Sequence, residues 1–370
     1  MKIRFSANEA QYSAHREEID KLLLQSVTQE QLIGGGSVAS LESALAAYVG
    51  GDEAIVCNSQ FNAFVLLFMS LGLKAGDEVI TSVLGSGIAA EAILFMGAKP
   101  VFVDIDESDC TIDVAHIEDA ITERTKIIIP VSLFGLCPDM EAINTLARQH
   151  DICVIEDAAQ SFGSGYKGSR SCSLSKLAAT SFHPDMPLGA YGNGAALFIE
   201  DRALRARARE LLSLGKHGDE FVHIGIDAAM DGIQAAVVAY KLAIFDEEIR
   251  QRRALYAKYD ARLGAYAALK PDTAHTSNFA YYPVRVGKKE ALAERLLQAG
   301  IETRIPFHRP LHLHKAFKRL DYDRGDFPVA EKVLGQLLLL PLHAYMREDE
   351  QETVISAFLQ QLRHAHVFSY

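Results

Sequence analysis

Short apolar runs alternate with helix-like stretches between about residues 53 and 200. The runs that we predict as strands are Glu53–Cys57, Glu78–Thr81, Pro100–Asp104, Lys126–Pro130, Ile152–Glu156 and Ala195–Ile199. Helix-like stretches such as Ile88–Met96 and Met140–His150 lie between them. Strands that are buried on both faces read as continuous apolar runs, so this spacing predicts a mostly parallel sheet wrapped by helices.

A different pattern follows this α/β part. Residues from about 203 to 263 have Ala-rich and charged faces and read as helical. The elements expected after them are strands at Phe279–Val286 and Glu302–Ile305, a helix at Lys288–Ala299 and a last helix at about Glu348–His364. We therefore predict a large α/β domain at residues 1–245, with an N-terminal helical segment, and a smaller C-terminal α+β domain at residues 246–370.

Sheets of this kind bind ligands beyond the carboxyl ends of their strands. Polar residues that stand just after the apolar runs are therefore candidate site residues. They are Asn58, Ser59, Asp104, Asp157 and Ser181.

Composition narrows the class of protein. The chain has 370 residues, of which 49% are hydrophobic and 23% charged, as in ordinary globular proteins. Its net charge is -11 and its basic residues are scattered, which argues against a nucleic-acid partner. The longest apolar candidate, Leu337–Leu342, is interrupted by Pro341 and is too short to span a membrane. No signal peptide is visible, so we expect a cytoplasmic protein. The five cysteines are odd in number and lack C-x-x-C spacing, which argues against a disulfide framework or a zinc site.

A series of short motifs runs from about Ile33 to the last predicted helix. In chain order they are Gly76–Thr81 with Gly97–Asp106, Ile155–Ser161, Ser181–Pro184 with Pro187–Gly192, Asp231–Ala236 and Leu340–His343. In this order and spacing they resemble the DegT/DnrJ/StrS family of sugar aminotransferases. The Pro187–Gly192 run is most similar to members that aminate 3-keto sugars on UDP-linked uronic acid or N-acetylhexosamine substrates.

The resemblance implies a fold and an activity. The fold is the α/β PLP-transferase fold of type I, similar to aspartate aminotransferase, in a homodimer whose pockets lie at the subunit interface. Family members hold PLP as a Schiff base, take an amino group from glutamate and pass it to a keto-sugar nucleotide.

Part of the implied cofactor site is present. An acid must pair with the pyridine nitrogen of PLP, and the resemblance assigns this role to Asp157. From the residues alone, Asp157 could equally cap the next helix. By the same resemblance, Gln160 flanks the phenolic oxygen of the cofactor and Ser181 hydrogen-bonds its phosphate.

The lysine that forms the Schiff base with PLP in the family is replaced in this chain. The family lysine stands five residues after the serine of the Ser-Phe-x-Pro motif, and that position is Met186. A thioether has no exchangeable proton and cannot form an imine. Lys176 lies in a different part of the loop and is not expected to substitute. His183 is the nearby candidate base, and the alternative is that it packs or hydrogen-bonds within its turn. We therefore assign no catalytic residue, and we do not expect PLP as a Schiff base.

Other motif positions depart from the family as well. Its phosphate cradle of Asn/Ser-Gly-Thr type is replaced by Ser59, Gln60 and Phe61, and Ser86 stands where an aromatic ring usually stacks on the cofactor. An asparagine that reaches the phosphate from the partner subunit corresponds to Asp227, whose carboxylate would repel a phosphate. The arginine of the same motif corresponds to Ala229.

The segment from Pro306 to His314 corresponds to the part of the family that binds the sugar substrate. Its His308, Arg309 and His312 could hold a diphosphate, and they could equally lie in a solvated loop. No carboxylate shares the spacing of these histidines, so we predict no metal site.

The changed positions all belong to one pocket, and this favours natural loss of transaminase chemistry. A chain can keep the fold of a family and lose its activity, because fold does not fix function. Two functions then remain: a non-catalytic partner or regulator, as a homodimer or a heterodimer with an active paralogue, and a binder of a nucleotide sugar. The alternatives are an engineered Lys→Met variant of an aminotransferase and a repurposed sugar-modifying enzyme.

Overall fold

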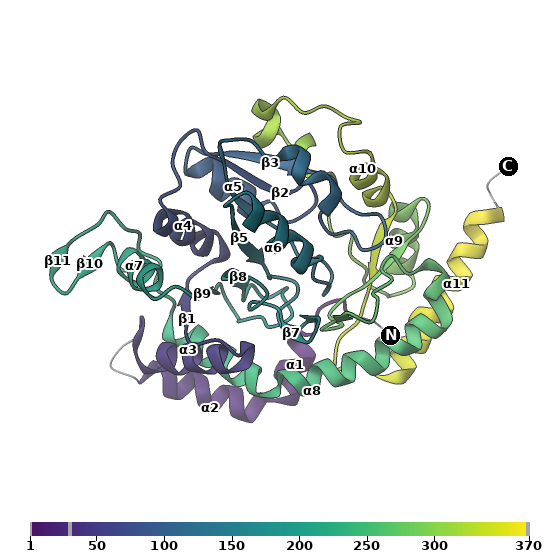
Figure 1. Ribbon diagram of the computed structural model, residues 1–370. Coiled ribbons are helices and arrows are strands. Elements are labelled where there is room, and N and C mark those ends of the chain that lie inside the picture. Colours follow the sequence, from purple (N-terminus) through teal and green to yellow (C-terminus); the bar gives the residue numbers. More distant parts are fainter. Residues whose placement is uncertain (1, 29–31, 368–370) are drawn as a thin grey trace.

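A seven-stranded sheet forms the centre of the larger part of the molecule (Figure 1). The computed structural model describes residues 2–28 and 32–367. In spatial order the strands are β1 (Ala54–Cys57), β9 (Ala195–Ile199), β8 (Leu177–Ser181), β5 (Cys153–Asp157), β4 (Thr125–Ile129), β2 (Glu78–Ser82) and β3 (Lys99–Val103). Strand β9 runs antiparallel to both neighbours, and the other pairings are parallel. The carboxyl ends of all the strands except β9 therefore meet at one edge.

Helices cover both faces of this sheet. One face carries α4 (Gln60–Leu71), α5 (Ile88–Phe95) and α7 (Arg202–Leu212). The other carries α3 (Gly35–Val49), α6 (Met140–Gln149) and the first half of α8 (Gly232–Leu263). Strands β1, β2, β8 and β9 are buried along their whole length, which explains their continuous apolar runs. The prediction of an α/β fold with a helix-wrapped, mostly parallel sheet is confirmed.

Helix α4 begins at the carboxyl edge of the sheet, directly after β1. The Ser59 hydroxyl accepts a hydrogen bond from the Asn62 N–H at 3.2 Å, which satisfies one of the free amides of the first turn. The helix ends at Gly72, whose φ of 72° lies in the left-handed region that glycine adopts without steric cost. These two caps fix where the first turn, with Gln60 and Phe61, meets the sheet.

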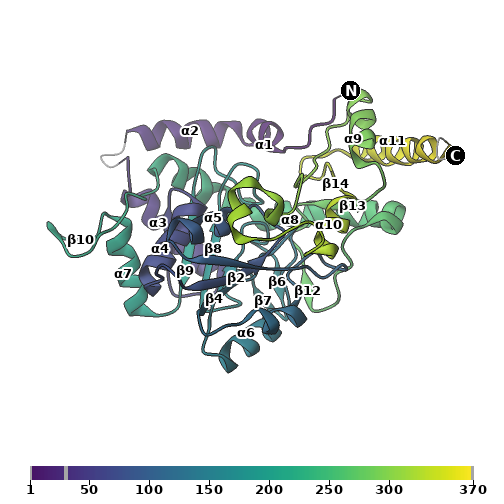
Figure 2. The same ribbon diagram turned by 90° about the horizontal axis from the view of Figure 1, so that it is seen from above.

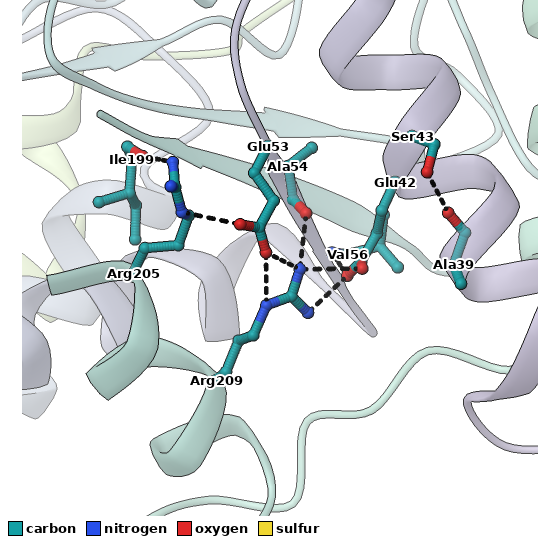
Figure 3. Close-up of polar contacts among 9 residues, drawn as sticks. All are labelled: Ala39, Glu42, Ser43, Glu53, Ala54, Val56, Ile199, Arg205 and Arg209. Atoms are coloured by element: carbon teal, nitrogen blue, oxygen red, sulfur yellow. Dashed lines mark hydrogen bonds and ion pairs between the residues drawn. The ribbon is translucent and has the colours of Figure 1, made fainter. Parts of the chain in front are cut away.

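A charged cluster ties α3, the start of β1 and α7 together (Figure 3). The Arg209 guanidinium donates to Glu53 at 2.8 Å and to Glu42 at 3.0 Å, and Arg205 pairs with the other oxygen of Glu53 at 3.0 Å. Glu42 also accepts from the backbone N–H of Val56 at 3.0 Å. Helix α7 leads into the hairpin of β10 (Lys216–His217) and β11 (Glu220–Phe221), which extends away from the rest of the molecule in both ribbon views (Figures 1 and 2).

The C-terminal part is built around a second, small sheet. Strands β13 (Tyr282–Arg285) and β14 (Leu337–Leu340) pair antiparallel and pack with α9 (Lys289–Gln298), α11 (Glu348–Val367) and the end of α8. Helix α10 (Pro328–Leu334) packs in one apolar cluster with residues that follow β2. Helices α1 (Asn8–Ala14) and α2 (Arg16–Val27) precede α3, and α2 packs along α8.

Short elements complete the fold. Strand β6 (Gly165–Tyr166) pairs with β7 (Ser169–Arg170) and with β12 (His275–Thr276). The 3₁₀ turns are η1 (Val114–His116), η2 (Glu118–Ala120), η3 (Gly264–Tyr266), η4 (Leu311–Leu313) and η5 (Lys315–Leu320).

Two predictions of local structure are wrong. The helical stretch expected at 203–263 is two helices, α7 and α8, because the polar and glycine-containing segment between them forms the β10–β11 hairpin. The strand expected at Glu302–Ile305 is reduced to one isolated bridge between Arg304 and Leu339, since it lies at the margin of the small sheet.

The domain division stays a prediction. Helix α8 runs without a break through residues 245 and 246. Its side chains change partners further along, because Ile249 belongs to the core of the large sheet whereas Tyr259 belongs to the core around β13 and β14.

Candidate functional site

A cavity of about 370 Å³ opens at the carboxyl edge of the central sheet, and residues of the C-terminal part close its other side. Loops that follow β1, β2, β4, β5 and β8 all contribute to it, as expected for an open α/β sheet. The sequence-predicted residues that line it are Ser59, Gln60, Phe61, Ser86, Asp157, Gln160, Ser181, His183 and Met186.

Asp157 lies at the floor of this cavity as the last residue of β5, and its side chain is almost fully buried. Its Oδ1 accepts from the Gln60 amide at 2.7 Å and from the backbone N–H of Ala159 at 3.2 Å. Burial raises the pKa of Asp157 from its ordinary value of 3.8 to about 6, although both hydrogen bonds oppose this shift. Asp157 thus bonds the backbone after the strand and lines the cavity, and its pairing with a cofactor nitrogen stays a prediction.

Gln160 and Ser181 lie on the wall beside Asp157. The Gln160 side-chain oxygen accepts from the backbone N–H of Phe134 at 2.8 Å, which fixes the orientation of its amide. The Ser181 hydroxyl accepts from the backbone N–H of His183 at 3.2 Å. Both side chains line the cavity, and their assignment to particular cofactor atoms stays a prediction.

Met186 occupies a tight turn after β8. Its backbone N–H donates to the His183 carbonyl at 2.8 Å, and its half-buried side chain lines the cavity. The exposed His183 ring accepts from the backbone N–H of Asp185 at 3.2 Å, as in the interpretation that it hydrogen-bonds within its turn. Lys176 precedes β8 at the opposite end of that strand. Among the residues that the structure describes, none of the side chains lining the cavity is a lysine.

Gln60 and Phe61 lie in the first turn of α4, where this helix lines the cavity. Gln60 is 4% exposed, and its amide is engaged by Asp157. The Phe61 ring packs edge to face against Phe95 of α5 at a centroid distance of 5.6 Å. Ser86 is exposed at the rim of the cavity, and its hydroxyl accepts from the Ile88 N–H at 3.4 Å. Bulky side chains thus stand at the helix start, where small residues leave backbone amides accessible to an anion.

Sequence reasoning did not identify an ion pair across the cavity rim. The Arg304 guanidinium pairs with the Asp185 carboxylate at 3.2 Å, and both side chains are 38% exposed. The Tyr281 hydroxyl donates to the Asp185 carbonyl at 3.2 Å, so the C-terminal part holds the Met186 turn at two points. Arg304 stands two residues before Pro306, at the start of the predicted sugar segment, and a search for cations next to that segment would have found it.

Several sequence-predicted residues do not line this cavity. His312 is buried, contacts Glu331 at 3.2 Å and packs on the Phe327 ring at 4.8 Å. His308 and Arg309 are exposed, and Phe307 and Pro306 of the same segment line the cavity instead. Asp104 accepts from the backbone N–H groups of residues 329 and 330. Asp227 is exposed next to the β10–β11 hairpin and is not among the residues that line the cavity.

The order of the strands and the cavity at their carboxyl edge are those of a PLP-dependent aminotransferase of fold type I. The crystal structure of DesV from S. venezuelae, in complex with a ketimine intermediate, superimposes with a TM-score of 0.94 and 30% identity, covering 98% of both chains. The model of the DegT/DnrJ/EryC1/StrS aminotransferase family matches residues 13–359, and the chain belongs to this family.

Two curated relatives extend the comparison. The UDP-2-acetamido-2-deoxy-3-oxo-D-glucuronate aminotransferase of Pseudomonas aeruginosa is 39% identical over 350 residues, which cover 93% of this chain and 96% of the relative. A protein of Geobacillus stearothermophilus named pleiotropic regulatory protein is 35% identical over 360 residues, which cover 96% of this chain and 97% of the relative. The resemblance to sugar aminotransferases that act on UDP-keto sugars is thereby confirmed.

The residues present do not fit a covalently held PLP. A Schiff base needs a primary amine, and Met186 supplies a thioether. The acid that would pair with a pyridine nitrogen already accepts from Gln60. No group of histidine, cysteine or acidic side chains arranged to hold a metal ion occurs within the described part of the chain. Over the same residues, no helix is both long and apolar enough for a membrane span.

Proposed function

We propose that this family member has lost transaminase chemistry and binds a nucleotide sugar, or a related anionic sugar, in the cavity above Asp157. The observation that carries the proposal is the hydrogen bond from the Gln60 amide to Asp157, in a cavity whose family lysine position is Met186. A lone lysine replacement would change one position, whereas here a second side chain, Gln60, also bonds Oδ1 of the acid. The engineered-variant alternative does not explain this second change.

The lining of the cavity supports a sugar-containing ligand. Aromatic rings of Phe134, Tyr281 and Phe307 offer apolar walls, and the amides of Gln160 and Asn193 offer donors and acceptors. Protein sites for small molecules commonly combine apolar walls with a few polar groups in roughly 300–1,000 Å³, a range that includes this cavity.

Arg304 supports the anionic character of the ligand. Its guanidinium lines the cavity, and a guanidinium binds phosphate or carboxylate oxygens through paired N–H donors. A diphosphate or a uronate carboxylate would compete with Asp185 for Arg304. The Pseudomonas aeruginosa relative is named for a UDP-linked glucuronate, which contains both anionic groups.

Exposed apolar side chains support an assembled form. Phe221 of the hairpin is 65% and the nearby Ile224 88% exposed, and Val27 at the end of α2 and Ile33 before α3 are 61% and 65% exposed. Exposed large apolar side chains of this kind are typical of surfaces that a partner covers. A homodimer, or a heterodimer with an active paralogue, fits these surfaces, and the regulatory name of the Geobacillus relative accords with a role as partner or regulator.

Calorimetry tests the proposed ligand. We expect saturable binding of a UDP-linked N-acetylhexosaminuronate to the purified protein and no glutamate-dependent amination of UDP-keto sugars. Uridine serves as the control ligand that lacks both the diphosphate and the sugar. Turnover of a UDP-keto sugar would overturn the loss of chemistry, and absence of binding to every UDP sugar would overturn the ligand.

The variant Met186→Lys separates natural loss from a single replaced residue. We expect that an added lysine alone does not restore transamination, because Gln60 and Phe61 still occupy the start of α4. PLP titration followed by borohydride reduction and intact-mass measurement shows whether the new amine reacts, with Met186→Gln as the matched control. Full activity from Met186→Lys alone would contradict the proposal and indicate a recently inactivated enzyme.

Co-purification distinguishes the partner role from a stand-alone binder. Co-expression with an active family member that has its own lysine is expected to give a heterodimer if this chain acts as its partner. A chain that elutes only as a homodimer in the presence of the active member would exclude the heterodimer.

A further inference from the structure

The first residues of the chain add an edge to the small C-terminal sheet. Ile3 forms a parallel bridge with Ile301, and its carbonyl accepts from the Glu302 N–H at 2.9 Å. Two residues further on, the backbone N–H of Phe5 donates to the Glu302 carboxylate at 3.2 Å. These contacts fix the N-terminal segment beside the stretch of chain that carries Arg304.

Phe5 contacts the side chain of Arg304. The guanidinium carbon of Arg304 lies 4.6 Å from the centre of the Phe5 ring, which is half-buried. The two terminal nitrogens of the guanidinium each lie 3.2 Å from a carboxylate oxygen of Asp185. The backbone of Arg304 is fixed as well, since it exchanges hydrogen bonds of 2.8 and 3.1 Å with Leu339 of β14. An aromatic face attracts a cation without occupying its N–H donors, so Arg304 keeps the donors that Asp185 does not engage.

The same segment also contacts the other side of the cavity rim. The Asn8 side-chain amide donates to the Pro184 carbonyl at 3.4 Å, directly before Asp185 in the chain. The N-terminal segment therefore touches both stretches of chain that carry the ion pair at the rim, and it lines a small hollow behind them. The family motifs begin only at about Ile33, so sequence analysis does not include this segment in the site.

The Arg304 side chain depends on these contacts for its position. It is 38% exposed, and a long side chain loses considerable rotamer freedom when it is held in one place. An ion pair that is this exposed is weak, and it is broken when a ligand anion displaces Asp185. The Phe5 ring can stay on the guanidinium in both situations, so it is the contact that keeps Arg304 at the rim.

We infer that Phe5 is a positioning residue of the cavity: its ring holds the Arg304 guanidinium at the rim, ready to bind the anionic group of the ligand. This inference rests on the proposed function and adds the N-terminal segment to the site. The anionic group is a carboxylate or a phosphate, since either accepts from paired N–H donors. Phe5 acts through Arg304, because it is not among the residues that line the main cavity.

Calorimetric titration with a UDP-linked N-acetylhexosaminuronate tests the role of Phe5. Phe5→Leu should weaken binding about two- to ten-fold, the cost of immobilising one long side chain on binding. Phe5→Tyr keeps the ring and should restore the affinity of the unmodified protein. Phe279→Leu is the matched control, because the Phe279 ring contacts a different guanidinium, that of Arg253 at 5.3 Å, and does not line the cavity. This control should bind as the unmodified protein does.

A double-mutant cycle separates the positioning of Arg304 from a general loss of structure. In Arg304→Met, the further change Phe5→Leu should not alter the affinity, because no guanidinium remains to be positioned. An equal weakening by Phe5→Leu with and without Arg304 would overturn the inference. The Arg304 Nε–H resonance, recorded with isotope-labelled arginine, needs no ligand. Its ring-current shift should persist in Phe5→Tyr and disappear in Phe5→Leu, and an unchanged resonance in Phe5→Leu would show that the ring does not hold Arg304.

Failure of this inference is distinguishable from failure of the proposed function. If the unmodified protein binds no UDP sugar, the proposed function fails and this inference fails with it. If the unmodified protein binds and Phe5→Leu binds equally well, only the positioning role is wrong.

A second ligand distinguishes the two sources of the anionic group. UDP-N-acetylglucosamine has the diphosphate and lacks the carboxylate. An equal loss of affinity for both ligands in Phe5→Leu would show that Arg304 binds the diphosphate. A loss confined to the uronate would show that it binds the carboxylate, and both outcomes support the positioning role of Phe5.

Discussion

The side-chain amide of Gln60 donates a 2.7 Å hydrogen bond to Asp157, and the two residues are 97 positions apart in the sequence. Gln60 begins α4 after β1, and Asp157 ends β5, so the contact crosses the carboxyl edge of the sheet. The contact engages one carboxylate oxygen, Oδ1, of a buried acid from within the chain.

The first prediction concerns the pH dependence of stability. Burial raises the pKa of Asp157 from 3.8 to about 6, so between these values the folded protein holds more protons than the unfolded chain. The stability contributed by this group is therefore complete below about pH 4 and is lost as the pH rises toward 6, by roughly 3 kcal/mol. In Asp157→Asn, the fall in the free energy of unfolding over this interval should become shallower, as measured by urea denaturation at several pH values.

The matched control for this prediction is Asp119→Asn, because Asp119 is exposed on η2. It should leave the pH dependence unchanged. Some dependence should remain in Asp157→Asn, because burial also raises the pKa of Glu156 to about 7. An unchanged slope in Asp157→Asn would mean that Asp157 is ionised in the folded protein throughout this range.

The second prediction concerns the ion pair at the cavity rim. If an anionic sugar nucleotide competes with Asp185 for Arg304, then Asp185→Asn should strengthen its binding about two- to five-fold, the range expected for a partly exposed ion pair. Arg304→Met should weaken binding about ten-fold, because a charge-assisted hydrogen bond is lost. Calorimetric titration of the two variants gives both values. Weaker binding in Asp185→Asn would show that Asp185 contacts the ligand itself.

The third prediction concerns the cluster in Figure 3. Arg209 joins Glu42 and Glu53, and its loss leaves the Glu42 side chain, which is 13% exposed, without its charged partner. Arg209→Met should lower the free energy of unfolding by about 1 to 2 kcal/mol in urea denaturation. Arg207→Met, at an exposed position of the same helix, should change it by less than about 0.5 kcal/mol. Equal effects of the two variants would show that the cluster adds no stability.

The sequence predicted the fold wherever burial left a simple pattern. Strands covered on both faces read as apolar runs, and β1 to β5 lie within about a residue of their predicted positions. Strand β8 was not predicted as a strand, because Ala178 to Ser181 are small or hydroxylated residues without a β-rich pattern. The hairpin after α7 was missed because its strands are two residues long and exposed.

From the sequence, only those site residues that belong to family motifs could be predicted. Motif order placed Asp157, Gln160 and Ser181 near the position of Met186, and the structure brings all four to one cavity. Motifs do not describe which side chains bond one another. The pairing of Gln60 with Asp157 depends on how α4 meets the sheet, and the pairing of Arg304 with Asp185 depends on how the C-terminal part closes over it.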